Sequence, residues 1–204
     1  MRARPGAVCL WLLLVSSVAV ADTDLMQREP WQACEYCHGS EGRIDSAQVP
    51  AIAGQSASYI KKQLSDFRAG RRASPEGQMR SAMLLLDEAD DAAVAGYFSS
   101  LPDAAPPSTE WEATSTGVAA KLFWQGDGQR PACVTCHATS RDDLFEAHPH
   151  LIGMNRDYLA RQLRAFRDGG RANDINGVMR QQAAALNEDQ IDALAAYLAG
   201  SGAP

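Results

Sequence analysis

The stretch C-E-Y-C-H at residues 34–38 recurs as C-V-T-C-H at residues 133–137, 99 positions further along the chain. The pattern C-x-x-C-H is typical of c-type haem attachment, in which both thiols add to the vinyl groups of one haem and the adjacent histidine binds the iron. The sequence therefore predicts two covalently attached haem c groups. The thiols predicted to hold them are Cys34, Cys37, Cys133 and Cys136. The predicted proximal iron ligands are His38 and His137.

Three other uses of paired cysteines account for this pattern less completely. Two structural disulfides would leave the histidine after each pair unexplained. A zinc site would need the two pairs much closer together than 99 positions. A thioredoxin-like dithiol would need a βαβ context, which this helix-forming sequence does not show.

Other segments repeat at the same spacing, which indicates an internal duplication. Residues 50–54, P-A-I-A-G, return as P-H-L-I-G at residues 149–153. The pattern Y-x-x-x-Q-L-x-x-F-R-x-G at residues 59–70 returns at residues 158–169. The duplication predicts two tandem domains with one haem in each.

The offset between the two copies rises to 100 after Gly169, so we expect one inserted residue there and a match between Arg71 and Arg171. The boundary between the copies falls in a stretch with three prolines, residues 101–109, which cannot continue a helix. The predicted parts of the chain are a signal peptide (1–21), a first haem domain (22–103), a linker (104–113) and a second haem domain (114–204).

The first 21 residues have the features of a secretory signal peptide. Arg2 and Arg4 precede an apolar run at residues 7–15, and the sequence A-V-A at residues 19–21 supplies a cleavage site. The apolar stretch is shorter than the ~20 residues that span a bilayer, so an uncleaved anchor is the weaker alternative. We therefore expect a periplasmic protein with no transmembrane segment in the mature chain.

Apolar residues in each copy recur with helical periodicity. Ile60, Leu64 and Phe67 fall at i, i+4 and i+7, as do their counterparts in the second copy. Asp87 and Asn187 are placed as N-caps of a final helix in each copy. No alternating run of β-branched residues predicts a strand. We predict an all-α protein whose two domains each wrap around one haem, because domains this small need the haem as part of their core.

The second axial ligand decides the chemistry of each iron, because methionine favours electron transfer whereas an open position permits ligand binding. Met79 and Met179 are matched in the repeat, so each is predicted to be an axial ligand in a loop before the final helix. Met83 is predicted to pack in the core or at the haem edge, since the second copy has alanine there. Bis-histidine ligation by His148 or His150 is the weaker alternative to their being exposed, ordinary histidines.

The ordered motifs resemble those of the dihaem cytochromes c4. Each C-x-x-C-H is followed by P-x-x-x-G, the Y-to-G pattern, a methionine and a final helix ending near A-x-Y, over nearly the whole mature chain. The resemblance implies two tandem class I cytochrome c domains, in which the carbonyls of Pro50 and Pro149 accept a hydrogen bond from His38 and His137. The second motif lacks the glycines that follow the first, which predicts a differently shaped loop.

The resemblance also implies an electron carrier, not an enzyme, that shuttles between redox proteins such as a quinol-oxidising complex and a terminal oxidase or reductase. Two alternatives stay open. One is the cytochrome subunit of a larger oxidoreductase such as flavocytochrome c sulfide dehydrogenase. The other is a dihaem peroxidase-type enzyme, which needs an open iron. A net charge of −6 and a pI near 5.2 argue against nucleic-acid binding.

Basic side chains gather in the two matched helical stretches. They form either a solvated helix face or a set of cations that neutralise haem propionates or steer a redox partner. The cluster consists of Lys61, Lys62, Arg68, Arg71 and Arg72, with Arg161, Arg164, Arg167 and Arg171 in the second copy.

Overall fold

A computed structural model describes residues 29–103, 117–137 and 147–200. We refer to residues 29–103 as the first half and to the later described residues as the second half. The predicted signal peptide, the predicted linker and the loop directly after the second haem motif, residues 138–146, lie outside the described ranges.

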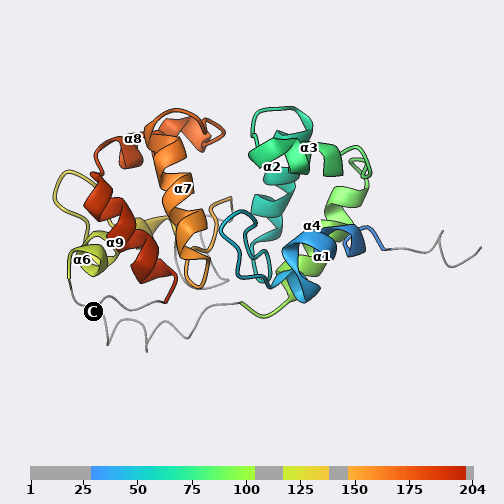
Figure 1. The fold of residues 1–204 in the computed structure, drawn as a ribbon, viewed down its shortest axis with the longest axis horizontal. Coiled ribbons are helices and arrows are strands. Elements are labelled where there is room, and N and C mark those ends of the chain that lie inside the picture. The colour runs from blue at the N-terminus through green and yellow to red at the C-terminus, as the bar shows by residue number, and fades with distance from the viewer. Residues whose placement is uncertain (1–28, 104–116, 138–146, 201–204) are drawn as a thin grey trace, which may run out of the picture.

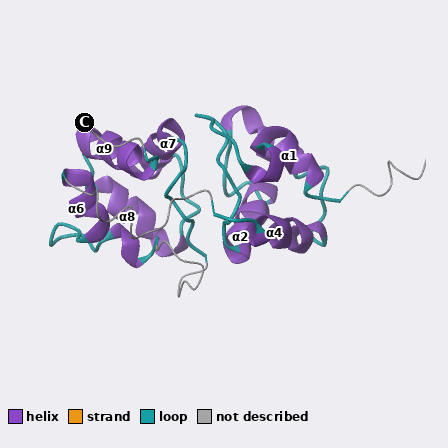
Figure 2. Ribbon diagram, turned by 90° about the horizontal axis from the view of Figure 1, so that it is seen from below, coloured by secondary structure: helices purple, strands orange, loops and turns teal. Residues whose placement is uncertain are grey.

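The described residues form helices and connecting turns, with no strand among them, which confirms the all-α prediction (Figure 2). The first half contains α1 (Gln32–His38), α2 (Ala57–Arg68), α3 (Gln78–Ala82) and α4 (Asp90–Ser100). The second half contains α6 (Val118–Trp124), α7 (Arg156–Arg167), α8 (Val178–Ala184) and α9 (Glu188–Leu198). Short 3-10 turns lie at Ser40–Gly42, Pro75–Gly77, Cys133–Thr135 and Ile175–Gly177. No helix in these ranges is long and apolar enough to cross a membrane.

The two halves lie side by side, with α2 and α7 facing one another in the middle of the molecule (Figure 1). Each half has its own apolar core. Phe98 and Val94 of α4 are fully buried with residues of α2 in the first half. Ile191 of α9 is fully buried with Phe123 of α6 in the second half. The duplicated sequence thus builds two separate cores.

Helices α2 and α7 begin at side-chain caps and bury the predicted apolar face. The Ser56 hydroxyl accepts a hydrogen bond from Tyr59 N, and the side-chain oxygen Oδ1 of Asn155 accepts one from Tyr158 N. Ile60, Leu64 and Phe67 are all buried, as their spacing predicts.

The caps of the final helices differ from the prediction in one half. Asn187 and Gln190 form the predicted capping box at the start of α9. Asp87 and Asp90 make the same reciprocal bonds, but the residues between them form a turn and α4 begins only at Asp90. The prediction of Asp87 as the N-cap was therefore wrong, because the hydrogen bonds between Asp87 and Asp90 close a turn that precedes the regular helix.

Gly42 ties the loop after the first haem motif to the rest of the first half. Its carbonyl accepts hydrogen bonds from Ile52 N and Ala53 N, which fixes the segment that follows Pro50. Its φ is +69°, and a Cβ at this position would lie 2.8 Å from the Phe98 ring. The loop therefore requires glycine for both backbone conformation and close packing.

We expect Gly42→Ala to lower the free energy of unfolding by about 2 to 4 kcal/mol, because the side chain is strained and overpacks the core. Thermal denaturation followed by circular dichroism measures the change. Gly96→Ala is the matched control: Gly96 lies in α4 with open space around it, so alanine there should stabilise by about 0.5 to 1 kcal/mol. An equal loss in both variants would contradict this explanation.

Candidate haem sites

The first haem motif lies on α1, which ends at His38. Cys34 is half-buried and Cys37 is exposed, and both are free thiols. Burial, followed by the charges of Glu35 and Cys37, raises the pKa of the Cys34 thiol to about 11. The second motif occupies the turn Cys133–Thr135 and the residues after it, again with free thiols. No disulfide therefore joins these cysteines in the described part of the chain.

The histidine of each motif is buried and hydrogen-bonded to a proline carbonyl. The distance from His38 Nδ1 to Pro50 O is 2.8 Å, and that from His137 Nδ1 to Pro149 O is 2.9 Å. Burial lowers the pKa of both rings, to about 4 for His137, and the bond to the carbonyl offsets only part of this. Both imidazoles are therefore neutral at pH 7, with the proton on Nδ1 and a lone pair on Nε2.

The other ring nitrogen of His137, Nε2, shows whether the site could hold a metal ion. It is buried, and it has no hydrogen-bond partner among the described residues. An orphaned imidazole nitrogen with its lone pair free suits a metal ligand better than a core residue. The residues present therefore fit an iron-bearing group at this position.

Each half contains a cavity that brings the predicted ligands together. In the first half it encloses about 1310 Å³ of empty space, including the part open to solvent, and is lined by Cys34, Cys37, His38 and Met79. In the second half two adjoining cavities of about 840 and 810 Å³ share their walls. The residues common to both walls include His137, His148, Leu151, Leu163 and Met179.

Matched turns position the two methionines. Each turn has one residue with positive φ, Glu76 or Asn176, followed by a left-handed glycine. The chain then enters α3 or α8, whose second residue is Met79 or Met179. The prediction that these methionines lie in loops was therefore wrong: each lies in the first turn of a short helix, which gives it a fixed direction.

The competing ligand candidates have other environments. Met83 is buried and lines the first cavity, consistent with its predicted packing role. His148 lines the second cavities and packs edge-on against His137, with ring centroids 5.8 Å apart. His150 exchanges backbone hydrogen bonds with the side chain of Gln55 in the first half. Both histidines are half-buried, so the expectation of exposed side chains was wrong.

Comparisons with known proteins agree with this geometry. The family model of cytochrome c matches residues 119–201. The thiosulfate dehydrogenase electron acceptor of Stutzerimonas stutzeri is 36% identical over 83% of this chain and 79% of its own. Cytochrome c4 of Azotobacter vinelandii is 35% identical over 82% of this chain and 83% of its own. The chain belongs to the cytochrome c4 family.

A solved structure extends the agreement to the fold. The reduced recombinant cytochrome c4 from Pseudomonas stutzeri superposes with a TM-score of 0.67 at 34% identity, covering 82% of this chain and 92% of that one. The fold is therefore that of class I cytochromes c, and the chain is a c-type cytochrome in electron transfer. Membership of this family implies covalently bound haem c, which the cysteine pairs and the cavities beside them fit.

The two halves of this c4-family chain meet through a nearly symmetric pair of arginines. Arg72 Nη1 donates to Gln63 at 2.6 Å, and Arg171 Nη1 donates to Gln162 at 2.7 Å. The two guanidinium groups also cover equivalent phenylalanine rings, at 4.7 and 4.4 Å from their centroids. Arg72, not Arg71, is thus the counterpart of Arg171, and the predicted match was wrong by one residue.

The inserted residue of the second copy therefore lies beyond Arg171. The turns at Pro75–Gly77 and Ile175–Gly177 are 100 positions apart, so the insertion precedes Ile175. Ser74 and Asp174 each accept a backbone hydrogen bond from the short helix that follows, so they are equivalent. This leaves Asn173 as the additional residue.

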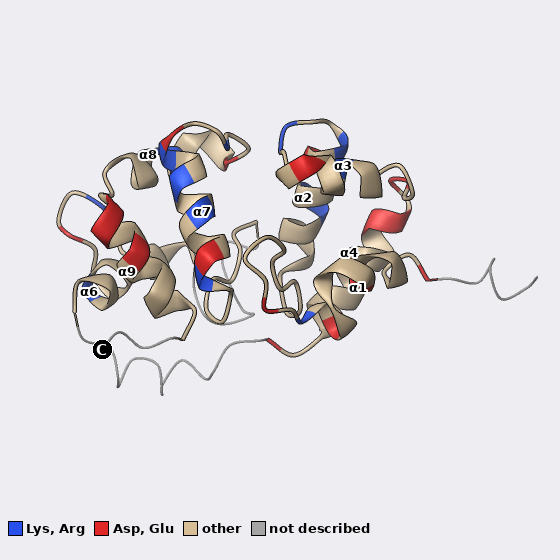
Figure 3. Cartoon of the chain, viewed as in Figure 1, with Lys and Arg blue, Asp and Glu red and all other residues tan. Residues whose placement is uncertain are grey.

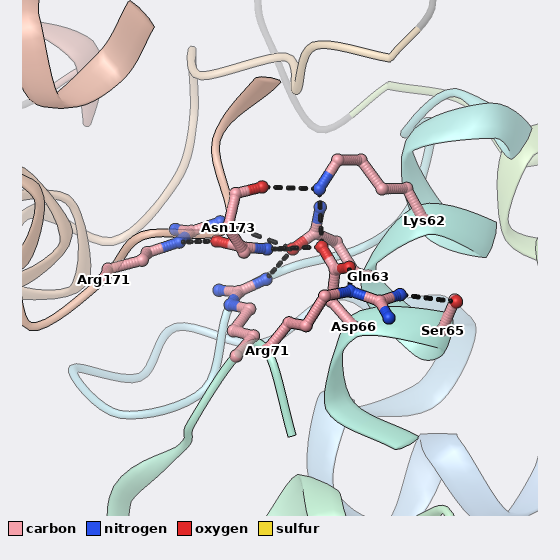
Figure 4. Close-up of polar contacts among 8 residues, drawn as sticks. Lys62, Gln63, Ser65, Asp66, Arg71, Arg171 and Asn173 are labelled. Carbon is pink, nitrogen blue, oxygen red and sulfur yellow. Dashed lines mark hydrogen bonds and ion pairs between the residues drawn. The ribbon is translucent and has the colours of Figure 1, made fainter. Parts of the chain in front are cut away.

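Asn173 crosses the interface and binds α2 (Figure 4). Its side-chain nitrogen donates to Gln63 Oε1 at 3.0 Å and to Asp66 Oδ2 at 2.7 Å. Its carbonyl accepts from Lys62 Nζ at 2.5 Å. Asp66 also accepts from Lys62 and Arg71, so a buried carboxylate is fully surrounded by donors.

Most of the predicted cation cluster is paired within the molecule. Arg68 binds Asp91, and Lys62 and Arg71 bind Asp66. In the second half, Arg164 binds Glu188 and Asp192, Arg167 binds Asp168 and Glu188, and Arg161 donates to the carbonyls of Ala47 and Gln48. These contacts favour an internal role for the cluster over a field that steers partners.

Sequence reasoning missed the interface because the repeat was matched by residue type alone. Both Arg71 and Arg72 fit the pattern, and the side chain that pairs with Gln63 is decided by packing. The sequence did contain one signal: the offset between the copies changes from 99 to 100 after Gly169. An inserted residue there indicates a segment that could make a new contact.

We expect Asp66→Asn to lower the free energy of unfolding at pH 7 by about 1.5 to 3 kcal/mol, because Lys62 and Arg71 lose their charged partner. Burial raises the pKa of Asp66, but the bonds from Lys62, Asn173 and Arg71 outweigh it and lower the pKa. The carboxylate therefore stabilises the fold fully above its unfolded pKa of about 3.9, and this contribution is lost as the pH falls through the folded value.

Thermal denaturation from pH 7 to pH 2 measures this effect. The gap between wild type and Asp66→Asn should narrow below about pH 5. Glu76→Gln is the control, since Glu76 is exposed and has no charged partner among the ion pairs of the described residues. A gap that stays constant down to pH 2 would show that the bonds do not depend on the charge of Asp66.

Proposed function

We propose that this chain is a periplasmic dihaem electron carrier, with one haem c in each half. His38 and Met79 bind one iron, and His137 and Met179 bind the other. Electrons pass between redox proteins of a respiratory chain, such as a quinol-oxidising complex and a terminal oxidase or reductase. The observation that supports this most is the repeated geometry: in each half, a buried histidine with its Nδ1 hydrogen-bonded lines the same cavity as the matched methionine.

Each protein group at such a site has a separate role. Haem c supplies the one-electron change of its iron. The carbonyls of Pro50 and Pro149 hold the imidazole rings in one orientation and raise their basicity. The methionine thioether favours the reduced state. Since both protein ligands stay in place in either state, little reorganises when the charge changes.

Arg72 and Arg171 suit the carboxylates of the two haems. Arg72 lines the first cavity and Arg171 lines the second, and both are enclosed by the interface. The Arg72 Nε is buried without a hydrogen-bond partner in the described part of the chain. Burial raises the pKa of Tyr59, but the charges of both arginines outweigh this and lower it. A site with this much positive charge and a spare donor favours a propionate.

A second candidate function is acceptance of electrons from a thiosulfate-oxidising enzyme. It is favoured by the similarity to the thiosulfate dehydrogenase electron acceptor of Stutzerimonas stutzeri. The matched methionines argue against the peroxidase-type alternative, because that chemistry needs an open iron. A place as a subunit of a larger oxidoreductase is compatible with the same two sites.

The assignment of the axial ligands is tested by replacing one methionine at a time. Wild-type protein reduced with dithionite should keep its visible spectrum under carbon monoxide, because both irons have a sixth ligand. Met179→Ala should give a carbon monoxide spectrum for half of the haem, and Met79→Ala should do the same for the other half. Alkaline pyridine spectra, divided by protein concentration, should give two haems for each chain.

Met83→Leu is the matched control, because Met83 lines the first cavity but has no partner in the repeat. It should resist carbon monoxide as the wild type does. Carbon monoxide binding by the wild type, or by Met83→Leu alone, would overturn the ligand assignment and favour an enzyme with a labile iron.

The electron donor is tested with purified components. Oxidised protein mixed with a thiosulfate dehydrogenase and thiosulfate should be reduced within seconds if the second candidate is right, and it should stay oxidised when the enzyme is omitted. Reduction by quinol with a quinol-oxidising complex, without reduction in the thiosulfate assay, would favour the respiratory shuttle. Absorbance of the reduced haem follows both reactions.

A further inference from the structure

The first half carries three large apolar side chains in solvent. Tyr36 is 93% exposed, Leu84 is 84% exposed and Leu85 is 78% exposed. Their counterparts in the second half are smaller: Thr135, Ala184 and Ala185. We call Tyr36, Leu84 and Leu85 the apolar patch. Because exposed leucines and tyrosines cost solubility, a patch kept in one copy and absent from the other points to a contact surface.

Leu85 of the apolar patch lies at the opening of the first cavity, and Tyr36 and Leu84 each neighbour in sequence a residue that lines it. Leu85 lines that cavity although it is largely exposed, so it lies at the mouth. Cys37 lines the same cavity, is also exposed, and directly follows Tyr36 on α1. Leu84 precedes Leu85 just beyond α3. A protein bound here would come close to the group that the first cavity holds.

Carboxylates lie next to the residues of the apolar patch in the sequence. Glu35 precedes Tyr36 in sequence, and Asp87 and Glu88 follow Leu85 within three residues. Figure 3 shows acidic residues in red at the start of α4, where Asp90 and Asp91 lie in the first turn. Arg68 of α2 binds Asp91 and is close enough to Asp87 and Glu88 to feel their charges, and exposed Arg80 lies four residues before Leu84. The carboxylates still outnumber these two arginines. The rim of the patch is therefore negative.

We propose that the apolar patch is the docking site of a redox protein whose own contact surface is apolar and ringed by lysines or arginines. The proposal rests on the proposed function, because the partner exchanges electrons with the first haem. Charge complementarity selects this occupant: the acidic rim attracts a basic ring, and it repels both a second copy of this chain and an anionic membrane. The apolar centre excludes water from the contact.

The experiment measures electron exchange with mitochondrial cytochrome c, used as a cationic redox protein. Holoprotein is mixed with the probe in a stopped-flow instrument at several ionic strengths. The second-order rate constant should fall steeply with salt. Leu84→Ala with Leu85→Ala, which reproduces the alanine pair of the second half, should lower it about five-fold. Glu88→Lys should lower it about three-fold and weaken its salt dependence.

Two changes in the second half serve as controls. Asp189→Lys makes the same change in charge on an exposed residue of α9, and Val118→Ala removes an exposed apolar side chain of α6. Both should leave the rate within a factor of about 1.5 of wild type at moderate salt, where distant charges are screened. Equal losses in the controls and the patch variants would overturn the proposal, as would an unchanged rate in the leucine variant.

Two further measurements separate the possible failures. An unaltered visible spectrum and unaltered reduction potentials in every variant show that the haems and the driving force are unchanged, so a slow rate then reports docking. Protein that binds no haem c would contradict the proposed function and not the patch itself. Sedimentation tests the other occupant: a wild-type dimer that the leucine variant dissociates would assign the patch to a second copy and overturn the proposal.

Discussion

The hydrogen bond from a buried imidazole to a proline carbonyl organises each half of this molecule. A neutral ring in an apolar site must place its one N–H, and the carbonyls of Pro50 and Pro149 accept it. This choice fixes which nitrogen keeps its lone pair. It also requires the segment after the motif to return to the ring, which explains the tight turn at Gly42 and its bonds to Ile52 and Ala53.

A second constraint is the burial of positive charge between the halves. Two guanidinium groups, Arg72 and Arg171, lie at one interface, and burial, followed by the charge of Arg72, lowers the pKa of Arg171. Tyrosine hydroxyls and glutamine oxygens satisfy part of their donors, as in the 2.9 Å bond from Arg72 to Tyr158. Two buried guanidinium groups favour anionic partners, so the proposed haem propionates would stabilise the interface between the halves as well as the haems.

The sequence predicts those features of this fold that depend on local pattern. The spacing of Ile60, Leu64 and Phe67 is a short-range signal, and the helix that it predicts is present as α2. The helical setting of Met79 and Met179 was missed, because a five- to seven-residue helix after a glycine has weak periodicity. The role of Asn173 was missed for a different reason, since its contacts join residues more than 100 positions apart.

Divergence between the copies follows from the different surfaces they present. Residues facing the interface are constrained by a partner that changes with them, which is why Gln63 and Gln162 still hold equivalent arginines. Residues facing outward have no such constraint. Leu84 and Leu85 stand against alanines at the matched positions, and all four residues are exposed, so packing of the protein core does not account for the difference. The docking site proposed for the first half would use this difference, because a partner that needs Leu84 and Leu85 would discriminate between the two ends of the molecule.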